Sequence, residues 1–268
     1  MDRIENIDFC ISYLLEQNQT QADIPAELAE KQRLLRALMN IWKPQPLSKE
    51  FLRAQNAELQ AQLTDKGVVT MEDISASGST TPLLWQGDIT RLRVDAIVNA
   101  ANSQMMGCWH PLHACIDNCI HSAAGLQLRA ECAEAMSSIE CPPEHEEYTF
   151  NGTVYRHAFT TETLITKAYN LPCRYVIHTV GPIISDGIPT KEQERQLANC
   201  YRNCIGLAEA NGCRSIAFCC ISTGEFRFPN RRAAEIAVEA CKDAPIKVIF
   251  NVFKDIDYDI YRELLGKD

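Results

Sequence analysis

The chain has 268 residues, 46% hydrophobic and 23% charged, a composition typical of globular proteins and outside the range of disordered chains. Its 26 basic and 35 acidic residues give a net charge of −9, which argues against broad nucleic-acid binding because such binding needs a cationic face. The charge does not exclude a small diphosphate ligand, since backbone N–H groups at the start of a helix can bind one.

The first 66 residues differ in composition from the rest of the chain. Two stretches, 27–42 and 48–63, have apolar residues at helical spacing and lack interior glycine. Ser48 follows the sequence KPQP, which suits the start of a new helix. We therefore predict a helical extension over residues 1–66, followed by a main domain over residues 67–268.

Short β-rich runs alternate with helical stretches after residue 67. Near-continuous apolar strands in such an alternation indicate an α/β sandwich with a mixed, mostly buried sheet. We expect strands at 83–87, 95–100, 163–169, 175–180, 215–221 and 247–253. We expect helices at 113–125, 126–136, 192–212, 231–243 and 255–266.

Thirteen cysteines are scattered along this chain. An odd number, with no small-residue cleavage site after the charged and apolar N-terminal segment MDRIENIDFCISYLL, indicates free thiols and not a disulfide framework. No apolar run approaches the roughly 20 residues that span a bilayer. We therefore expect a cytoplasmic protein with no membrane segment, whose thiols are available to bind a metal.

Polar residues follow the first two strands, at the place where ligands bind in α/β sheets. The sequence QGDIT (86–90) puts Asp88 directly after a strand, where it fits either a ligand contact or a simple turn. The sequence NAAN (99–102) ends the next strand with two amides. Amides suit ribose hydroxyls because they offer donors and acceptors without charge, and they also suit a loop cap.

Two later strands also lead into candidate ligand loops. The sequence ISTGEFRFPN (221–230) has small residues that let backbone N–H groups approach phosphate oxygens before the next helix begins. Many turns of this kind are rich in Ser and Gly, so the signal is weak by itself. In NVFKD (251–255), Phe253 leaves the last strand, where it can stack on a nucleobase or belong to the core.

The stretch GCWHPLHACIDN (107–118) combines cysteines and histidines. Cys108, His113 and Cys115 are the natural ligand set, since two thiolates and one imidazole suit zinc. Three protein ligands leave a fourth position open, as in catalytic zinc sites. His110 and Cys119 compete for that position. A chance cluster also fits, because buried cysteine behaves as a small hydrophobic residue.

The order of these motifs resembles the macrodomain family, whose members bind ADP-ribose, over roughly residues 70–265. The resemblance implies a three-layer α/β/α sandwich with a mixed sheet. It also implies that Asp88 and the neighbouring Ile89 N–H recognise adenine, and that Asn102 contacts the distal ribose. It places the diphosphate at the loop formed by Ser222, Thr223, Gly224, Glu225 and Phe226.

Two departures from the common macrodomain pattern stand out. The usual run of glycines after NAAN is replaced by GCWHPLHAC, and Glu225 and Arg227 occupy positions where small or apolar residues are more usual. The first departure resembles the zinc-containing branch of the family, which tends to carry an N-terminal helical extension. That resemblance implies one Zn²⁺ per chain and puts Asp117 at the position of the catalytic aspartate. We expect His121 to pack, and His145 and His178 to have structural roles.

The sequence therefore predicts a zinc-dependent hydrolase that removes mono-ADP-ribose from acidic side chains, with Asn102 and Asp117 as catalytic residues and ADP-ribose as the product. The resemblance implies a modified protein as substrate, such as a lipoyl-carrier protein modified by a sirtuin-type transferase. Three alternatives stay open. The chain could bind ADP-ribose without cleaving it, it could act on a small ADP-ribose derivative, or its zinc could only hold a loop together.

Overall fold

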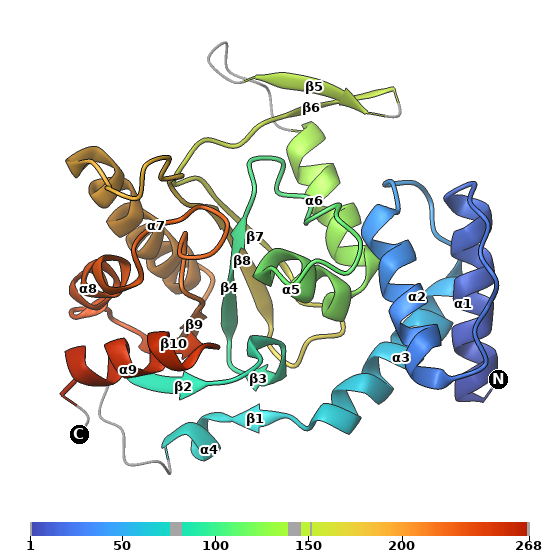
Figure 1. The fold of residues 1–268 in the computed structure, drawn as a ribbon, viewed down its shortest axis with the longest axis horizontal. Helices are drawn as coiled ribbons and strands as arrows, with labels where there is room; N and C mark the ends of the chain where they lie inside the picture. The colour runs from blue at the N-terminus through green and yellow to red at the C-terminus, as the bar shows by residue number, and fades with distance from the viewer. Residues whose placement is uncertain (1, 76–81, 139–145, 151, 267–268) are drawn as a thin grey trace.

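A six-stranded sheet forms the centre of the molecule in the computed structural model, which describes residues 2–75, 82–138, 146–150 and 152–266 (Figure 1). Five strands are parallel, and the edge strand β7 runs antiparallel to its neighbour β8. The sheet is therefore mixed, as expected. Its strands, in spatial order, are β2 (Leu83–Gln86), β10 (Lys247–Val252), β9 (Ser215–Phe218), β4 (Ala96–Ala101), β8 (Tyr175–Val180) and β7 (Thr163–Lys167).

The middle of the sheet opens at the carboxyl end of β4. This strand pairs with β8 from Ala96 to Ala101, but with β9 at Ala96 and Ile97. The ladder with β9 thus ends before the carboxyl end of β4. Crevices at such edges are where α/β sheets bind ligands.

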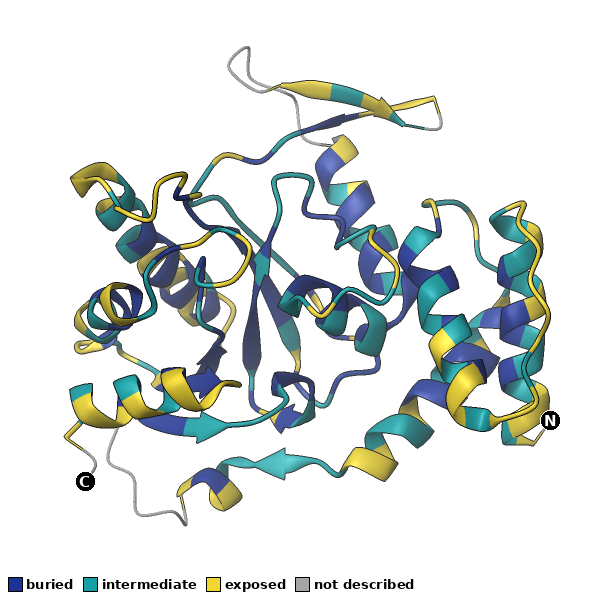
Figure 2. Ribbon diagram, viewed as in Figure 1, coloured by how far each residue is buried: buried dark blue, intermediate teal, exposed yellow. Residues whose placement is uncertain are grey.

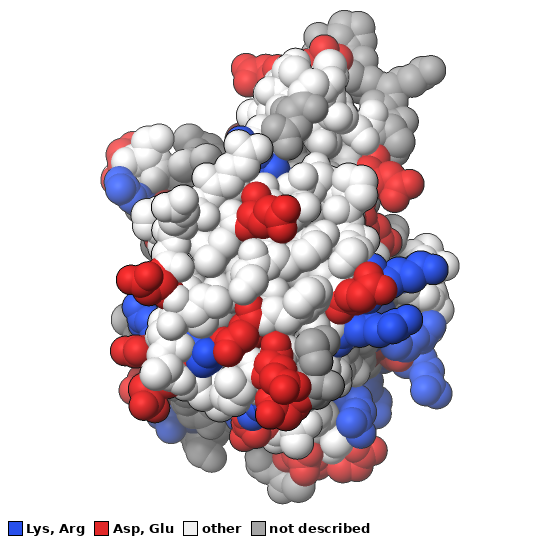
Figure 3. Space-filling view, turned by 90° about the vertical axis from the view of Figure 1, so that its right-hand side faces the viewer, with Lys and Arg blue, Asp and Glu red and all other residues white. Residues whose placement is uncertain are grey.

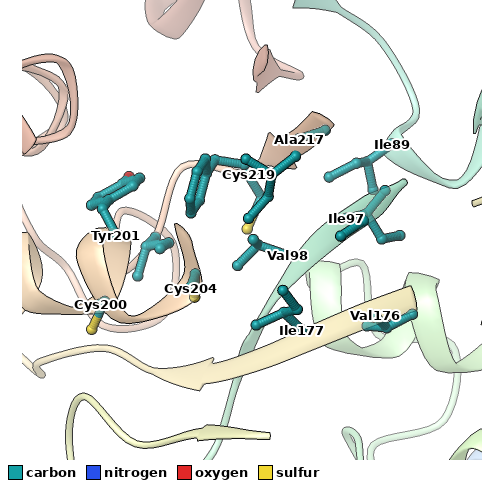
Figure 4. Packing of buried hydrophobic residues seen from close by; sticks show 14 of the residues in the cluster. Ile89, Ile97, Val98, Val176, Ile177, Cys200, Tyr201, Cys204, Ala217 and Cys219 are labelled. Atoms are coloured by element: carbon teal, nitrogen blue, oxygen red, sulfur yellow. The ribbon is translucent and has the colours of Figure 1, made fainter. Parts of the chain in front are cut away.

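Helices cover both faces of the sheet and give three layers (Figure 1). Apolar residues fill the space between the layers; in Figure 4, Cys204 of one helix points toward Val98 and Ile177 of the sheet, and Cys200 and Tyr201 belong to the same buried cluster. These buried cysteines act as small hydrophobic residues. One face carries α7 (Lys191–Ala210), α8 (Asn230–Cys241) and α9 (Asp255–Leu264), and the other carries α5 (Ile116–Ala124) and α6 (Leu126–Ser138).

The N-terminal helices form a bundle with its own core, in which Trp42 and Phe51 are fully buried together with Leu126 of α6. Figure 2 shows buried residues along the inner faces of these helices. The bundle packs against α5 through its second helix. The boundary at residue 66 stays a prediction. The helices are α1 (Arg3–Gln17), α2 (Leu28–Ile41) and α3 (Lys49–Lys66).

The expected helices and strands are all present, within about three residues at most ends. The sequence predicted the helical extension over residues 1–66 but gave no separate bounds for α1, because its apolar positions are interrupted by charged residues. It also missed several short elements that bury too little apolar surface to show a clear period. These are β1 (Val69–Thr70), α4 (Met71–Ser75), the 3₁₀ turn η1 (Ile89–Arg91), β3 (Leu92–Arg93), β5 (Glu147–Phe150) and β6 (Thr153–Arg156).

The face formed by the N-terminal helices is largely uncharged, with separate acidic groups spread across it, while basic groups gather mainly toward one edge (Figure 3). This face therefore offers no continuous cationic surface in the described part of the chain. Among the described helices, none has both the length and the apolar character needed to cross a bilayer.

Candidate functional site

A cleft of about 970 Å³ opens between the carboxyl edge of the sheet and the N-terminal bundle. All the site residues predicted from the sequence line it, although they come from segments far apart in the chain. The bundle supplies the opposite wall, including Arg33, Arg36 and Lys66, which local motifs did not indicate. The predicted residues that line the cleft are Asp88, Ile89, Asn102, Cys108, His113, Cys115, Asp117, Ser222, Thr223, Gly224, Glu225, Phe226 and Phe253.

Asp88 lies at one end of the cleft, at the start of η1. One carboxylate oxygen accepts hydrogen bonds from the Thr90 N–H at 3.0 Å and from Thr90 Oγ1 at 2.6 Å, while the other lies 3.0 Å from Lys66 Nζ. Burial opposes ionisation of Asp88, but the Thr90 hydroxyl and Lys66 outweigh it and lower its pKa. Asp88 is thus an anionic acceptor. Phe253, 76% exposed, offers a free aromatic face in the same cleft.

Asp117 lies in the first turn of α5 and is buried at 4% exposure. Asn99 Nδ2 donates to Asp117 Oδ1 at 2.8 Å, and Asn102 Nδ2 lies 3.4 Å from Oδ2. Burial raises the pKa of Asp117 to about 6, although the Asn99 amide and the Arg129 charge act in the opposite direction. A carboxylate with a pKa near neutrality is suited to accept a proton.

The two amides of NAAN have different roles. Asn102 is half-buried and faces the cleft, whereas Asn99 is fully buried and holds Asp117. Asn99 Nδ2 also lies 3.1 Å from Nδ1 of His178, whose Nε2 lies 3.0 Å from Thr166 Oγ1. His178 thus belongs to the buried support of Asp117. This agrees with the structural role expected for it.

His121 is buried and neutral, because burial lowers its pKa well below the ordinary value. Its Nε2 lies 3.5 Å from Asp117 Oδ1 and forms no hydrogen bond with it. Gly107, at φ +82°, passes so close that a Cβ there would lie 2.7 Å from His121 Cγ. His121 therefore packs beneath the loop, as expected. His145 lies outside the described residues.

Cys108, His113 and Cys115 are brought together as predicted, with their ligand atoms within 4.8 Å of one another. Cys108 Sγ lies 3.6 Å from His113 Nδ1. Zinc–sulfur and zinc–nitrogen bonds of about 2.3 and 2.1 Å at a tetrahedral angle give a separation of about 3.6 Å, so this pair fits zinc. Cys115 is the N-cap of α5, and burial raises the pKa of its thiol to about 12. A bound cation would act in the opposite direction, because it favours the thiolate.

The two competing ligands lie outside this group. Exposed His110 contacts His113 edge to face, with ring centroids 5.5 Å apart. Cys119 Sγ instead lies 3.7 Å from Arg36 Nη2. In the described residues, three side chains thus converge on one point, and the cleft gives access to it.

The second ring nitrogen of His113 faces the loop at 222–226. His113 Nε2 lies 3.5 Å from Glu225 Oε1. Metal-binding histidines commonly direct their second nitrogen to a carboxylate, which orients the ring. Glu225, an unusual residue at this position, thus joins the Ser-Thr-Gly loop to residues 108–115, the candidate metal-binding segment called the metal loop below.

The Ser-Thr-Gly loop has a strained backbone. Ser222 adopts a φ of +65°, and a Cβ on Gly181 would lie 2.1 Å from its Oγ, so only glycine fits beneath the loop. The Phe228 N–H bonds to the Ser222 carbonyl at 2.9 Å, and the Ile184 N–H to the Phe226 carbonyl at 2.8 Å. Gly224 has open space on its Cβ side. The loop is thus pinned at both ends and open toward the cleft.

Comparison with known proteins identifies the family. Residues 98–237 match the Macro domain family. The chain is 48% identical to a protein-ADP-ribose hydrolase of Treponema medium, covering 99% of this chain and 100% of the relative, and 39% identical to one of Staphylococcus aureus, covering 91% and 88%. It is also similar to the macrodomain of Trypanosoma brucei in complex with ADP-ribose, at 30% identity and a TM-score of 0.59, covering 83% of this chain and 92% of that one. The chain belongs to the Macro domain family.

Proposed function

We propose that this protein is a zinc-dependent protein-ADP-ribose hydrolase that releases mono-ADP-ribose from acidic side chains. The name of the relatives that match nearly the whole chain supports the hydrolase activity. The observation that carries the zinc dependence is the position of Asp117 and the Cys108–His113–Cys115 group in one cleft. A metal that only held a loop together would need no access to that cleft.

The lining residues suggest one direction for the bound ADP-ribose. Adenine would lie between Asp88 and Phe253, and the diphosphate would lie along the loop at 222–226. The distal ribose would lie beside Asn102, next to the metal loop. The open space at Gly224 lets the backbone approach phosphate oxygens closely, since no side chain intervenes.

The mechanism follows from the contacts of Asp117. Asn99 donates to one carboxylate oxygen, which fixes the side chain and leaves the second oxygen near Asn102 and the cleft. Asp117 there orients a water and accepts its proton. Cys108, His113 and Cys115 would hold a zinc ion, which would supply Lewis-acid chemistry beside the distal ribose. Asn102 positions the distal ribose for attack.

The test is a time course of free ADP-ribose released from a protein mono-ADP-ribosylated on acidic residues, with enzyme of measured zinc content. We expect repeated turnover. Tight ADP-ribose binding without release would instead identify a binding module. Release from a small acylated ADP-ribose, but not from the protein, would contradict the protein substrate. A lipoyl-carrier protein modified by a sirtuin-type transferase is the partner to test next.

A further inference from the structure

We propose that α2 of the N-terminal bundle positions the metal loop, and that Arg36 is the positioning residue on which zinc affinity depends. This inference rests on the proposed zinc site. It assigns a role to the helical extension beyond covering one side of the domain. Arg36 is not itself a metal ligand, because a guanidinium has only donors and cannot bind a cation.

The Arg36 guanidinium reaches from α2 into the segment that carries the ligands. Its Nη2 donates to the backbone carbonyl of His113 at 2.9 Å and to Asn118 Oδ1 at 2.7 Å. Its Nε donates to the same Asn118 oxygen at 3.1 Å. The Arg36 side chain thus holds both the backbone of the proposed metal-binding residue His113 and the first turn of α5.

Asn118 extends this contact to the rest of the metal loop. Its side chain is fully buried, and its Nδ2 donates to the His110 carbonyl at 2.9 Å. Its backbone N–H points at Cys115 Sγ at 3.4 Å, which stabilises a thiolate there. Arg36 therefore acts on two of the three ligands, His113 directly and Cys115 through Asn118.

Asn40, one helical turn after Arg36, holds the centre of the loop. Its Oδ1 accepts a hydrogen bond from the Leu112 N–H at 3.0 Å. Leu112 has a φ of +58°, a conformation that costs a residue with a Cβ on the order of 1–3 kcal/mol. The contact from α2 helps to keep this residue in the strained conformation that places His113 opposite Cys108.

Arg129 of α6 ties the end of α2 to the start of the same loop. Its Nη1 donates to the carbonyls of Met39, Asn40 and Trp42 at 3.2, 2.8 and 2.9 Å, and its Nη2 lies 3.3 Å from the Cys108 carbonyl. The metal loop is thus held in place close to each of the three proposed zinc-binding side chains. Because the loop is already ordered, it loses less conformational entropy when zinc binds.

If Arg36 positions the ligands, removing it should weaken zinc binding, whereas simple electrostatics predicts the opposite. The guanidinium brings positive charge close to the proposed cation, so charge alone predicts tighter zinc binding when Arg36 is removed. Positioning predicts weaker binding, by about 10–100-fold, as is common for residues that orient metal ligands. Arg36→Lys keeps the charge but loses the two-pronged contact, so positioning predicts weaker binding for this variant as well.

The experiment measures zinc affinity by competition with a chromogenic chelator, for full-length wild type, Arg36→Ala, Arg36→Lys and Arg53→Ala. Exposed Arg53 of α3 lies outside the cleft and serves as the matched control. We expect weaker zinc binding in both Arg36 variants and unchanged binding in Arg53→Ala. The absorption bands of the cobalt-substituted protein should also shift in the Arg36 variants, because they report the arrangement of the ligands.

The zinc affinities distinguish the proposed metal site from the proposed role of Arg36. Wild type that binds no zinc overturns the proposed metal dependence itself. Wild type that binds zinc, with Arg36→Ala binding it equally or more tightly, overturns only the positioning role. Circular dichroism and thermal unfolding confirm that the variants are folded. If Arg36→Ala fails to fold, Arg36→Lys decides the question, because it keeps the charge and the aliphatic stem.

Discussion

Asp117 combines burial, a raised pKa and two amide neighbours in one carboxylate. Asp117→Asn keeps the shape of the side chain but removes its ability to accept a proton. We expect kcat to fall by about 10²–10⁴-fold. The affinity for ADP-ribose should change by only a few-fold, because most of the lining residues lie elsewhere in the cleft.

Single-turnover release of ADP-ribose, with isothermal titration of ADP-ribose, measures both effects. Asp243→Asn is the matched control, since Asp243 is exposed two residues after the last residue of α8 and lies outside the cleft. Full activity in Asp117→Asn would remove this residue from the chemistry.

The low pKa of buried His178 should make the free energy of unfolding depend on pH. Burial lowers its pKa from 6.5 to about 3, so the unfolded state binds a proton that the folded state does not accept. The free energy of unfolding should therefore fall as the pH drops below 6.5, by about 2 kcal/mol for this residue between pH 6.5 and pH 5. His178→Gln removes the titrating group but keeps an acceptor for Asn99 and a donor for Thr166.

Urea unfolding at these two pH values, for wild type and His178→Gln, checks this prediction. The variant should lose about 2 kcal/mol less than wild type on acidification. Equal losses in both proteins would mean that His178 is protonated in the folded state.

Among the single elements, the Ser-Thr-Gly loop is the segment proposed to bind the diphosphate. A Cβ added at Gly224 would meet no atom beyond its chain neighbours within 4 Å, so a side chain there would begin in open space beside the cleft. Gly224→Val should therefore leave the free energy of unfolding within about 1 kcal/mol of wild type. It should weaken ADP-ribose binding by at least about tenfold, because it blocks the approach of phosphate to the backbone.

The matched control is Gly206→Val on the exposed side of α7, where an added Cβ also has open space around it. Titration of ADP-ribose into both variants makes the comparison. Equal affinities would show that the diphosphate does not lie on this loop.

The sequence predicted the loops of the site because each of them is a local motif. Asp88, Cys115 and Ser222 follow strands or begin helices that hydrophobic periodicity makes visible. The support of Asp117 by Asn99 was not predicted, although Asn99 lies in a recognised motif, because the sequence does not show which of two amides faces inward. Lys66 and Arg36 were missed for a different reason: their partners lie 22 or more residues away, and only the folded chain brings them together.

At the scale of the whole molecule, the bundle and the main domain share a buried charge. Arg129 is 2% exposed, donates to three carbonyls at the end of α2 and lies 4.1 Å above the ring of Trp109. Arg129→Met fills a similar volume but leaves those carbonyls without their donor. We expect the free energy of unfolding to fall by about 3 kcal/mol or more.

Denaturant unfolding monitored by circular dichroism gives this value, with Arg53→Met as an exposed control. A loss below about 1 kcal/mol would show that Arg129 does not hold the bundle to the domain.

A zinc titration of the metal-free enzyme shows whether hydrolysis depends on a metal held by Cys108, His113 and Cys115. Metal is removed with a chelator, and the rate of ADP-ribose release from the modified protein is followed as zinc is added back. Wild type should regain activity in proportion to zinc and reach its maximum at one equivalent per chain, while Cys115→Ser should not recover. Full release by the metal-free enzyme, or recovery in Cys115→Ser equal to that of wild type, would contradict a catalytic zinc held by Cys108, His113 and Cys115.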